Sequence, residues 1–270
     1  MFKKYLIFLL LVVPAACGGG GGAMTPPTPL EFPTPIPNPT PIRPNAKYVS
    51  LGDSIPYGLY ATSIQTQAFP VIVAQDLKAQ LINLAIPGEY SEGIIKDEVS
   101  KIPPGTQVIT LLIGTNDELS CVCANTLDPA VQAKGINTPA TVESTFAANM
   151  QAIGSALHNG FPGASIYVAN LPNLANLPEW KEWASMEQRT ALSNLNATLN
   201  DTIDQMGFPV VDLHCAAGAY DPSNYYNNGI GPLGDVHPNT QGHAYYASIF
   251  YATITSELYE SHACSYFTLQ

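Results

Sequence analysis

The stretch YVSLGDSIPYG (residues 48–58) runs from apolar or small residues into Gly-Asp-Ser and then into Pro and Gly. The first half is typical of a buried strand, and the second half is typical of a tight turn. A structural strand does not need a serine on such a turn, whereas a nucleophile does. Because a serine hydroxyl is a weak nucleophile by itself, Ser54 would need a base, an orienting acid and donors for an oxyanion from elsewhere in the chain.

Apolar runs like the one before Ser54 recur along the chain and alternate with amphipathic stretches of helical length. The expected strands cover residues 47–52, 80–85, 107–114, 165–170 and 209–214, and the expected helices cover residues 68–79, 91–100, 140–160, 186–207 and 240–260. The strands are too uniformly apolar for a sheet with one face in water. We therefore predict an α/β fold, a three-layer α/β/α sandwich around a central parallel sheet of about five strands with right-handed crossovers.

The composition is that of a globular protein with an acidic surface. The chain has 270 residues, of which 46% are hydrophobic and 11% are charged, and this is ample for a sizeable core. The formal net charge is −11, with ten Lys and Arg residues in total. Nucleic acid is not expected as a partner, because phosphate binding needs a basic surface. The acidity is interpreted as an aid to solubility.

The N-terminus has the layout of an export signal. Two lysines precede an apolar run over residues 5–13, which is too short to span a bilayer. The small residues before Cys17 resemble a bacterial lipobox, although Pro14 stands where that motif usually has leucine. We expect a signal peptide over residues 1–16 and a lipidated Cys17, and hence an extracytoplasmic, membrane-anchored lipoprotein. The alternative is ordinary secretion after cleavage near Ala16.

A Gly- and Pro-rich segment separates Cys17 from the rest of the chain. It contains five consecutive glycines (residues 18–22) and the run TPPTPLEFPTPIPNPTPIRP (residues 25–44). Frequent proline removes backbone donors and favours an extended polyproline-type spacer. We interpret residues 17–44 as a tether and residues 45–270 as the folded domain.

Four further cysteines, Cys121, Cys123, Cys215 and Cys264, suggest disulfides in an exported protein and allow three pairings. We expect Cys215 to pair with Cys264, which would close a loop of about 50 residues and contribute roughly 4 kcal/mol. A bond between Cys121 and Cys123 would be strained, since only one residue separates them. A zinc site formed by these two cysteines and a histidine is the alternative, but no second Cys or His pair has ligand spacing.

The base and its acid partner are expected in GDVHPNTQGH (residues 234–243). Asp235 and His237 are two apart, so an extended backbone would direct both side chains to one side. The carboxylate can then hold the imidazole in the tautomer that accepts a proton from serine. The alternative is that Asp235 caps a turn and His237 is a surface residue before Pro238.

Two further segments supply candidate donors for an oxyanion. In LLIGTND (residues 111–117) a fully apolar strand ends directly before Asn116, whose amide can point from the sheet edge. In NLAIPGEY (residues 83–90) the backbone N–H of Gly88 can approach a ligand closely, because glycine has no side chain. Since chemistry gathers at the carboxyl ends of parallel strands, both segments can meet Ser54 in one crevice.

These four segments together resemble the SGNH hydrolases, also called GDSL esterases and lipases. The matching blocks are Gly52–Ser54, Gly88, Gly114–Asp117 and Asp235–Pro238, in the family's order. The resemblance implies Ser54 as the nucleophile, His237 as the general base, Asp235 as its partner, and an oxyanion hole from the Ser54 N–H, the Gly88 N–H and the Asn116 side chain. It also implies that Asp53 and Asp117 hold their loops. Ile55 replaces the leucine of the GDSL name, and residues 121–139 are unlike the family pattern.

We therefore expect a serine carboxylic-ester hydrolase that works through an acyl-enzyme, on a small-molecule or glycan ester with a short or acetyl acyl group, without a metal or organic cofactor. Two alternatives stay open, an O-acyltransferase with the same triad and a catalytically inert surface binding protein. GIGPLG (residues 229–234) fits Gly-x-Gly-x-x-Gly but follows no strand, so we interpret it as a loop. His243 is expected to pack or cap, and several tyrosines, Tyr57, Tyr60, Tyr90, Tyr225 and Tyr226, can line the site.

Overall fold

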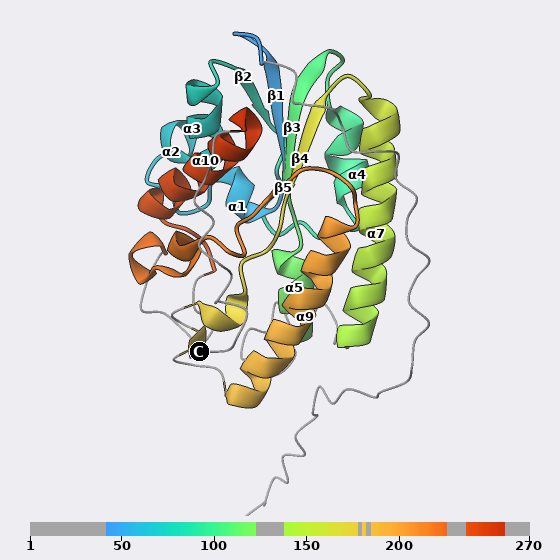
Figure 1. Ribbon diagram of the computed structural model, residues 1–270, viewed down its shortest axis with the longest axis vertical. Coiled ribbons are helices and arrows are strands. Elements are labelled where there is room, and N and C mark those ends of the chain that lie inside the picture. Colours follow the sequence, from blue (N-terminus) through green and yellow to red (C-terminus); the bar gives the residue numbers. More distant parts are fainter. Residues whose placement is uncertain (1–41, 123–137, 178–179, 182–184, 226–235, 257–270) are drawn as a thin grey trace, which may run out of the picture.

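The computed structural model describes residues 42–122, 138–177, 180–181, 185–225 and 236–256. Within them, five parallel strands form one sheet in the order β2-β1-β3-β4-β5. The strands are β1 (Lys47–Gly52), β2 (Gln80–Asn83), β3 (Thr106–Leu112), β4 (Ser165–Ala169) and β5 (Val210–Val211). Helices cover both faces of the sheet, so the predicted three-layer α/β/α fold is confirmed (Figure 1).

Two groups of helices flank the sheet. On one side lie α2 (Ile64–Gln67), α3 (Phe69–Asp76) and α10 (Thr240–Thr255), and on the other lie α4 (Ile94–Asp97), α5 (Thr115–Val122), α7 (Pro139–Gly160) and α9 (Met186–Asp204) (Figure 1). The short α1 (Ser54–Tyr57) follows β1 directly. Four 3₁₀ turns complete the described elements: η1 (Val99–Lys101), η3 (Leu174–Asn176), η4 (Ala217–Tyr220) and η5 (Pro222–Asn224).

The longest helix, α7, shows how the sequence sets the layers. The Thr138 side chain accepts a hydrogen bond from the Thr141 N–H and caps the first turn, and Pro139 fits the next position because its N–H would have no helical partner there. The buried residues of the helix recur at helical spacing on one side: Val142, Phe146, Met150, Ile153 and Leu157. This apolar stripe packs α7 toward the sheet, and the remaining faces meet water or other helices.

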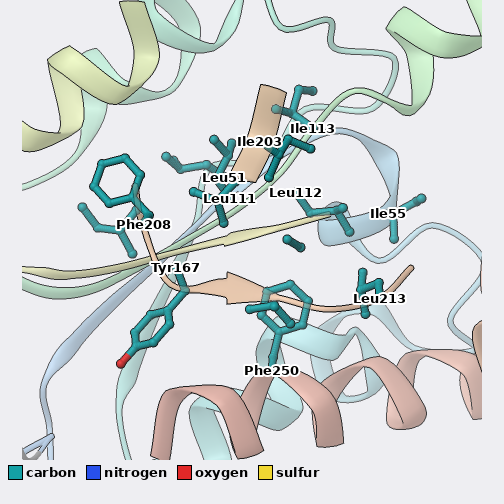
Figure 2. Packing of buried hydrophobic residues seen from close by; sticks show 14 of the residues in the cluster. Leu51, Ile55, Leu111, Leu112, Ile113, Tyr167, Ile203, Phe208, Leu213 and Phe250 are labelled. Atoms are coloured by element: carbon teal, nitrogen blue, oxygen red, sulfur yellow. The ribbon is translucent and has the colours of Figure 1, made fainter. Parts of the chain in front are cut away.

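The apolar core lies on both faces of the sheet. Phe250 points from α10 toward the strands, whereas Leu51 and Ile203 lie on the opposite side (Figure 2). All three side chains are fully buried, and each burial of this size contributes roughly 1.5–3 kcal/mol. The phenol of Tyr167 crosses to α10 and donates to the Ile254 carbonyl at 3.2 Å. Among the described helices, none is both long enough and apolar enough to cross a bilayer.

Several expected elements differ in length from those observed. The helix expected over residues 91–100 is two short pieces, because Glu98 leaves helical geometry with φ −127° and ψ −59°. The strand expected over residues 209–214 keeps its ladder only at Val210–Val211, since the Asn170 amide donates to Asp212 and draws the chain into a turn. The helices α1 and α5 were not expected, because polar residues after glycine are also typical of turns.

Candidate active site

The turn that carries Ser54 begins at a glycine that no other residue can replace without strain. Gly52, the last residue of β1, has φ +132°, and a Cβ atom there would lie 1.9 Å from the carbonyl oxygen of Leu112 on β3. Asp53 follows as the cap of α1, and its Oδ1 accepts from the Ile55 N–H at 2.9 Å. Ser54 is therefore the first residue of a helix and lies directly after β1, at the carboxyl edge of the sheet.

His237 reaches this serine from the other end of the chain. The Oγ atom of Ser54 lies 2.7 Å from Nε2 of His237, and the two residues are 183 positions apart. When the ring carries its proton on Nδ1, Nε2 accepts the hydroxyl proton, which is the arrangement a general base requires. Ser54 is 8% exposed, so the pair is shielded but reachable. Asp235, the predicted partner of the imidazole, lies outside the described residues.

The segment that holds His237 is fixed at the start of α10. The Oδ1 atom of Asn239 accepts from the Gln241 N–H at 2.9 Å and the Gly242 N–H at 3.0 Å, which caps the helix. Its Nδ2 atom donates to the carbonyl of Tyr225 at 2.9 Å. In addition, the Thr62 N–H donates to the hydroxyl of Thr240 at 2.8 Å, so the loop after Ser54 is tied to the same helix end.

Gly88, the predicted backbone donor, lies in a turn that is hydrogen-bonded to the serine turn. The Ile86 N–H donates to the Gly52 carbonyl at 2.9 Å, which joins the two strand-end loops. Gly88 has φ +80°, a left-handed conformation that favours glycine. A Cβ atom at this position would meet nothing within 4 Å, so the conformation, and not space, selects glycine here.

Asn116 and Asp117, at the start of α5, hold the loop that follows Gly88. The Nδ2 atom of Asn116 donates to the Glu89 carbonyl at 2.8 Å, and an amide nitrogen carries a second N–H. Asp117 accepts from the Ser91 hydroxyl at 2.6 Å and from the Ser91 N–H at 3.0 Å. As expected, Asp117 therefore holds a loop at the site, and Asp53 does the same through its bond to Ile55.

Three buried carboxyl groups surround the site, and the described residues show no ion pair to them. Burial raises the pKa of Asp53 to about 7, against the hydrogen bond from Ile55 and the charge of His237, which lower it. Burial also raises the pKa of Asp117, although its bonds to Ser91 lower it. Burial raises the pKa of Glu98 to about 8. Burial therefore favours the neutral form of all three carboxyl groups relative to a carboxyl group in water.

His243 is a structural histidine of the site, as its place in α10 suggested. Its Nδ1 atom accepts from the Phe69 N–H at 3.4 Å, and its Nε2 atom lies 3.1 Å from the Leu59 carbonyl, to which it donates. Burial lowers its pKa to about 4, so the ring is neutral at pH 7. Because the Leu59 N–H in turn donates to the Ser54 carbonyl at 3.0 Å, His243 supports the end of the serine helix.

The predicted tyrosines separate into different roles. The ring of Tyr60 contacts the His237 imidazole edge-on, with centroids 5.2 Å apart, and 38% of Tyr60 is exposed. Tyr57 is exposed to a similar degree, whereas Tyr225 is buried and its hydroxyl donates to the Ala219 carbonyl. Tyr226 lies outside the described residues. Tyr60 is thus the tyrosine for which contact with the base is established.

The disulfide expected between Cys215 and Cys264, and the alternative zinc site at Cys121 and Cys123, each include a residue outside the described part of the chain. Cys123 and Cys264 lie outside the described residues, so the pairing of Cys215 with Cys264 stays a prediction. Within the described part of the chain, no group of three or more His, Cys, Asp or Glu side chains is arranged to hold a metal ion.

The sequence reasoning missed Glu98. It lay within a stretch interpreted as an amphipathic helix, where an acidic residue normally faces water. In the structure its side chain is fully buried, and Oε2 accepts from the Gly52 N–H at 2.7 Å. No sequence pattern marks this contact, because its partner is a backbone group 46 positions away.

The chain is similar to known proteins at the level of a family and of the fold. A family model described as the GDSL-like lipase/acylhydrolase family matches residues 50–245. Similar solved structures include a phospholipase A1 from Streptomyces albidoflavus, an extracellular lipase from Streptomyces rimosus and the acetylxylan esterase Axe2 from Geobacillus stearothermophilus, each 18% identical, with TM-scores of 0.58, 0.57 and 0.52. The matches cover 79%, 79% and 80% of this chain and 100%, 100% and 96% of theirs. At this identity they show a shared fold. A search of curated proteins gave no match.

Proposed function

The chain belongs to the GDSL-like lipase/acylhydrolase family, and from this premise we propose that it is a serine carboxylic-ester hydrolase acting through an acyl-enzyme on short-chain or acetyl esters. Membership makes the protein an enzyme of the esterase and lipase type. The observation that carries the mechanism is the 2.7 Å contact between Ser54 Oγ and His237 Nε2. Such a contact lets a hydroxyl lose its proton as it attacks a carbonyl carbon.

In the proposed mechanism Ser54 attacks the ester carbonyl and His237 takes the hydroxyl proton. His237 then gives this proton to the leaving alcohol, and water activated by the same imidazole releases the acid and restores Ser54. Asp235 is assigned to steady the imidazolium, on the strength of its spacing from His237 in the sequence. The chemistry of the described residues requires no metal or organic cofactor in any of these steps.

The proposed oxyanion hole consists of the N–H groups of Ser54 and Gly88 and the amide of Asn116. The bond from Ile86 to Gly52 ties the first two donors together, and the bond from Asn116 to the Glu89 carbonyl ties the third to the same loop. A donor held in place before the reaction stabilises the developing charge without reorganisation, and each is worth about 3–4 kcal/mol.

The preference for short acyl groups rests on how few large hydrophobic side chains are exposed in the described part of the chain. In the described part of the chain the exposed large hydrophobic residues are Tyr57, Tyr60, Ile95 and Met186. A long acyl chain or a lipid surface would require a larger continuous apolar area. The similarity to the acetylxylan esterase Axe2 favours acetylated glycans as one substrate class. The similarity to the phospholipase A1 and the lipase is the reason to test esters with longer acyl chains as well.

The test is Ser54→Ala measured on p-nitrophenyl esters of graded acyl length and on acetylated polysaccharides. We expect turnover to fall by about 10⁴-fold or more, as it does when a triad member is removed. Ser155→Ala is the matched control, because Ser155 is exposed on α7 and bonds only along its own helix to Gln151. A fluorophosphonate probe should label the wild type at Ser54. Absence of labelling in folded protein would favour an inert binding protein.

Acyl transfer to a sugar hydroxyl is the second candidate, and the exposed ring of Tyr60 beside His237 is the observation that favours it. An aromatic face next to the base can stack on a sugar acceptor and hold its hydroxyl where water would otherwise attack. Product analysis with and without an added glycan separates the two reactions. A constant yield of free acid in both reactions supports hydrolysis.

For the N-terminus we propose export and lipidation at Cys17, followed by the tether of residues 17–44. The proposal rests on the charged-then-apolar layout and on the small residues before the cysteine. Radiolabelled palmitate should enter the wild type and should not enter Cys17→Ala. Release of the unlabelled variant into the medium would support export without an anchor.

A further inference from the structure

A buried carboxyl group lies directly beneath the serine turn. Glu98 is located between α4 and η1, and its side chain is fully buried. Oε2 accepts a hydrogen bond from the Gly52 N–H at 2.7 Å, which is the last N–H of β1. The contact joins two residues 46 positions apart, and one of them, Gly52, is two residues before Ser54.

Both the N–H and the carbonyl group of Gly52 form hydrogen bonds. While the Gly52 N–H is held by Glu98, the Gly52 carbonyl accepts from the Ile86 N–H at 2.9 Å. Ile86 in turn lies two residues before Gly88. Displacement of the Glu98 carboxyl would therefore move the Gly52 backbone, and with it the two loops that carry the N–H groups of Ser54 and Gly88.

Gly52 also has little freedom to adjust. It is held at φ +132°, and its Cα lies against the backbone of β3, where a Cβ atom would be 1.9 Å from the Leu112 carbonyl oxygen. Because β3 blocks movement of Gly52 toward Leu112, a change at the Gly52 N–H is passed along the chain toward Ser54 and is not absorbed at Gly52 itself. The hydrogen bond that the Gly52 N–H donates to Glu98 therefore lies at a closely packed point of the site.

The surroundings of Glu98 favour the neutral acid. The net effect raises the pKa of Glu98 to about 8: burial is the largest cause, and the negative charges of Glu89 and Asp53 act in the same direction. Hydrogen bonds from the backbone of Gly52 and Ile86 act against them. Among the described residues, the ion pair is the exposed one between Lys96 and Asp97, and none of them neutralises Glu98. Its Oε1 atom has no hydrogen-bond partner among the described residues.

We propose that Glu98 is a positioning residue for ester cleavage: its carboxyl oxygen holds the Gly52 peptide and thereby sets the oxyanion donors of Ser54 and Gly88. The inference rests on the proposed function. The residue does not touch the substrate. It acts through the backbone, so its loss should lower kcat more than it changes KM, because oxyanion donors act in the transition state.

Two substitutions separate positioning from folding. Glu98→Gln keeps an acceptor oxygen for the Gly52 N–H, whereas Glu98→Met has a similar length and offers no comparable acceptor. We expect kcat of the Gln variant on a short p-nitrophenyl ester to stay within about threefold of the wild type at pH 7. For the Met variant we expect kcat to fall about 10- to 100-fold with little change in KM, since removal of one oxyanion donor costs about 10²–10³-fold. Glu92→Gln, an exposed carboxyl in the preceding loop, is the matched control.

A measurement independent of hydrolysis tests the hydrogen bond itself. In wild-type protein the pH dependence of the Gly52 amide NMR signal should include a component with a midpoint near 8. This component should be absent in Glu98→Gln, whereas ionisation of the neighbouring Asp53 affects the signal in both proteins. A Gly52 amide signal that is the same in the wild type and in Glu98→Gln at every pH would overturn the proposal even if Glu98→Met does not fold. So would a folded Met variant with unchanged kcat. If the Gly52 signal titrates but the wild type cleaves no ester, the bond exists and the proposed function is wrong.

Discussion

The Oγ atom of Ser54 lies 2.7 Å from Nε2 of His237, although 183 positions separate the two residues in the chain. The contact exists because the end of β1 and the start of α10 meet at one edge of the sheet, and the bond from Thr62 to Thr240 links their loops. If the two side chains act as one unit, removing either should cost nearly as much as removing both.

This gives a first prediction for the variants Ser54→Ala, His237→Ala and the double variant. Each single change should lower kcat by about 10⁴- to 10⁶-fold, and the double variant should be no slower than the worse single one. Steady-state rates on a short p-nitrophenyl ester, corrected for non-enzymatic hydrolysis, measure this. Additive losses on a logarithmic scale would contradict the paired roles.

A second prediction concerns Gly52→Ala. The new Cβ would lie 1.9 Å from the Leu112 carbonyl oxygen, and the backbone at φ +132° suits glycine alone. Backbone atoms of a central strand cannot move aside, so we expect a loss of about 3 kcal/mol or more in the free energy of unfolding, or no folded protein. Denaturant unfolding with Gly105→Ala as the control should show a much smaller loss there, because that position has open space.

Gly88→Ala and Gly105→Ala form a matched pair for a third prediction. Both glycines have similar positive φ angles, +80° and +76°, and a Cβ atom at either position would meet nothing within 4 Å. We expect both variants to lose about 1–2 kcal/mol of stability from the left-handed backbone. Only Gly88→Ala should lower kcat, because a change in the Gly88 backbone moves its N–H away from the proposed oxyanion hole, to which Gly105 contributes no donor. Equal kcat values for the two folded variants would exclude Gly88 from the site.

The sequence predicted the sheet well because parallel strands are buried on both faces, and such runs stand out against the polar loops. Local composition alone predicts the strands that contain Leu51 and Leu111, and also the turn at Ser54. The support of the site was not predictable in this way. Glu98 and His243 act through backbone groups of Gly52 and Leu59, and no composition rule selects such partners across the chain.

A fourth prediction tests Tyr60 as a substrate contact. The ring has an exposed face and packs edge-on against the His237 imidazole, while its backbone adopts a left-handed φ of +64°. Loss of an aromatic contact costs about 0.5–1.5 kcal/mol, so Tyr60→Ala should raise KM for aryl or glycan esters roughly 2- to 12-fold. Tyr57→Ala is the control, because Tyr57 is exposed to a similar degree, whereas the aromatic contact with His237 is made by Tyr60. Identical KM values for the two variants would remove Tyr60 from the substrate site.

The last prediction is a loss of stability as the pH rises through neutrality. Burial raises the pKa of Asp53 from 3.8 to about 7 and that of Glu98 from 4.5 to about 8. The folded protein therefore holds these protons over a range in which the unfolded chain has released them. The resulting stabilisation is complete below the unfolded pKa values and is lost as the pH rises through the folded ones.

For Glu98 this window runs from about pH 4.5 to about pH 8, and within it one group contributes a slope of about −1.4 kcal/mol per pH unit to the free energy of unfolding. Glu98→Gln should reduce the slope by that amount, because the amide does not titrate, whereas Glu92→Gln should leave it unchanged. Urea unfolding at several pH values between 5 and 8.5 measures the slopes. Parallel curves for the wild type and Glu98→Gln would mean that Glu98 ionises near its ordinary pKa, and the neutral carboxyl group beneath Gly52 would then have to be abandoned.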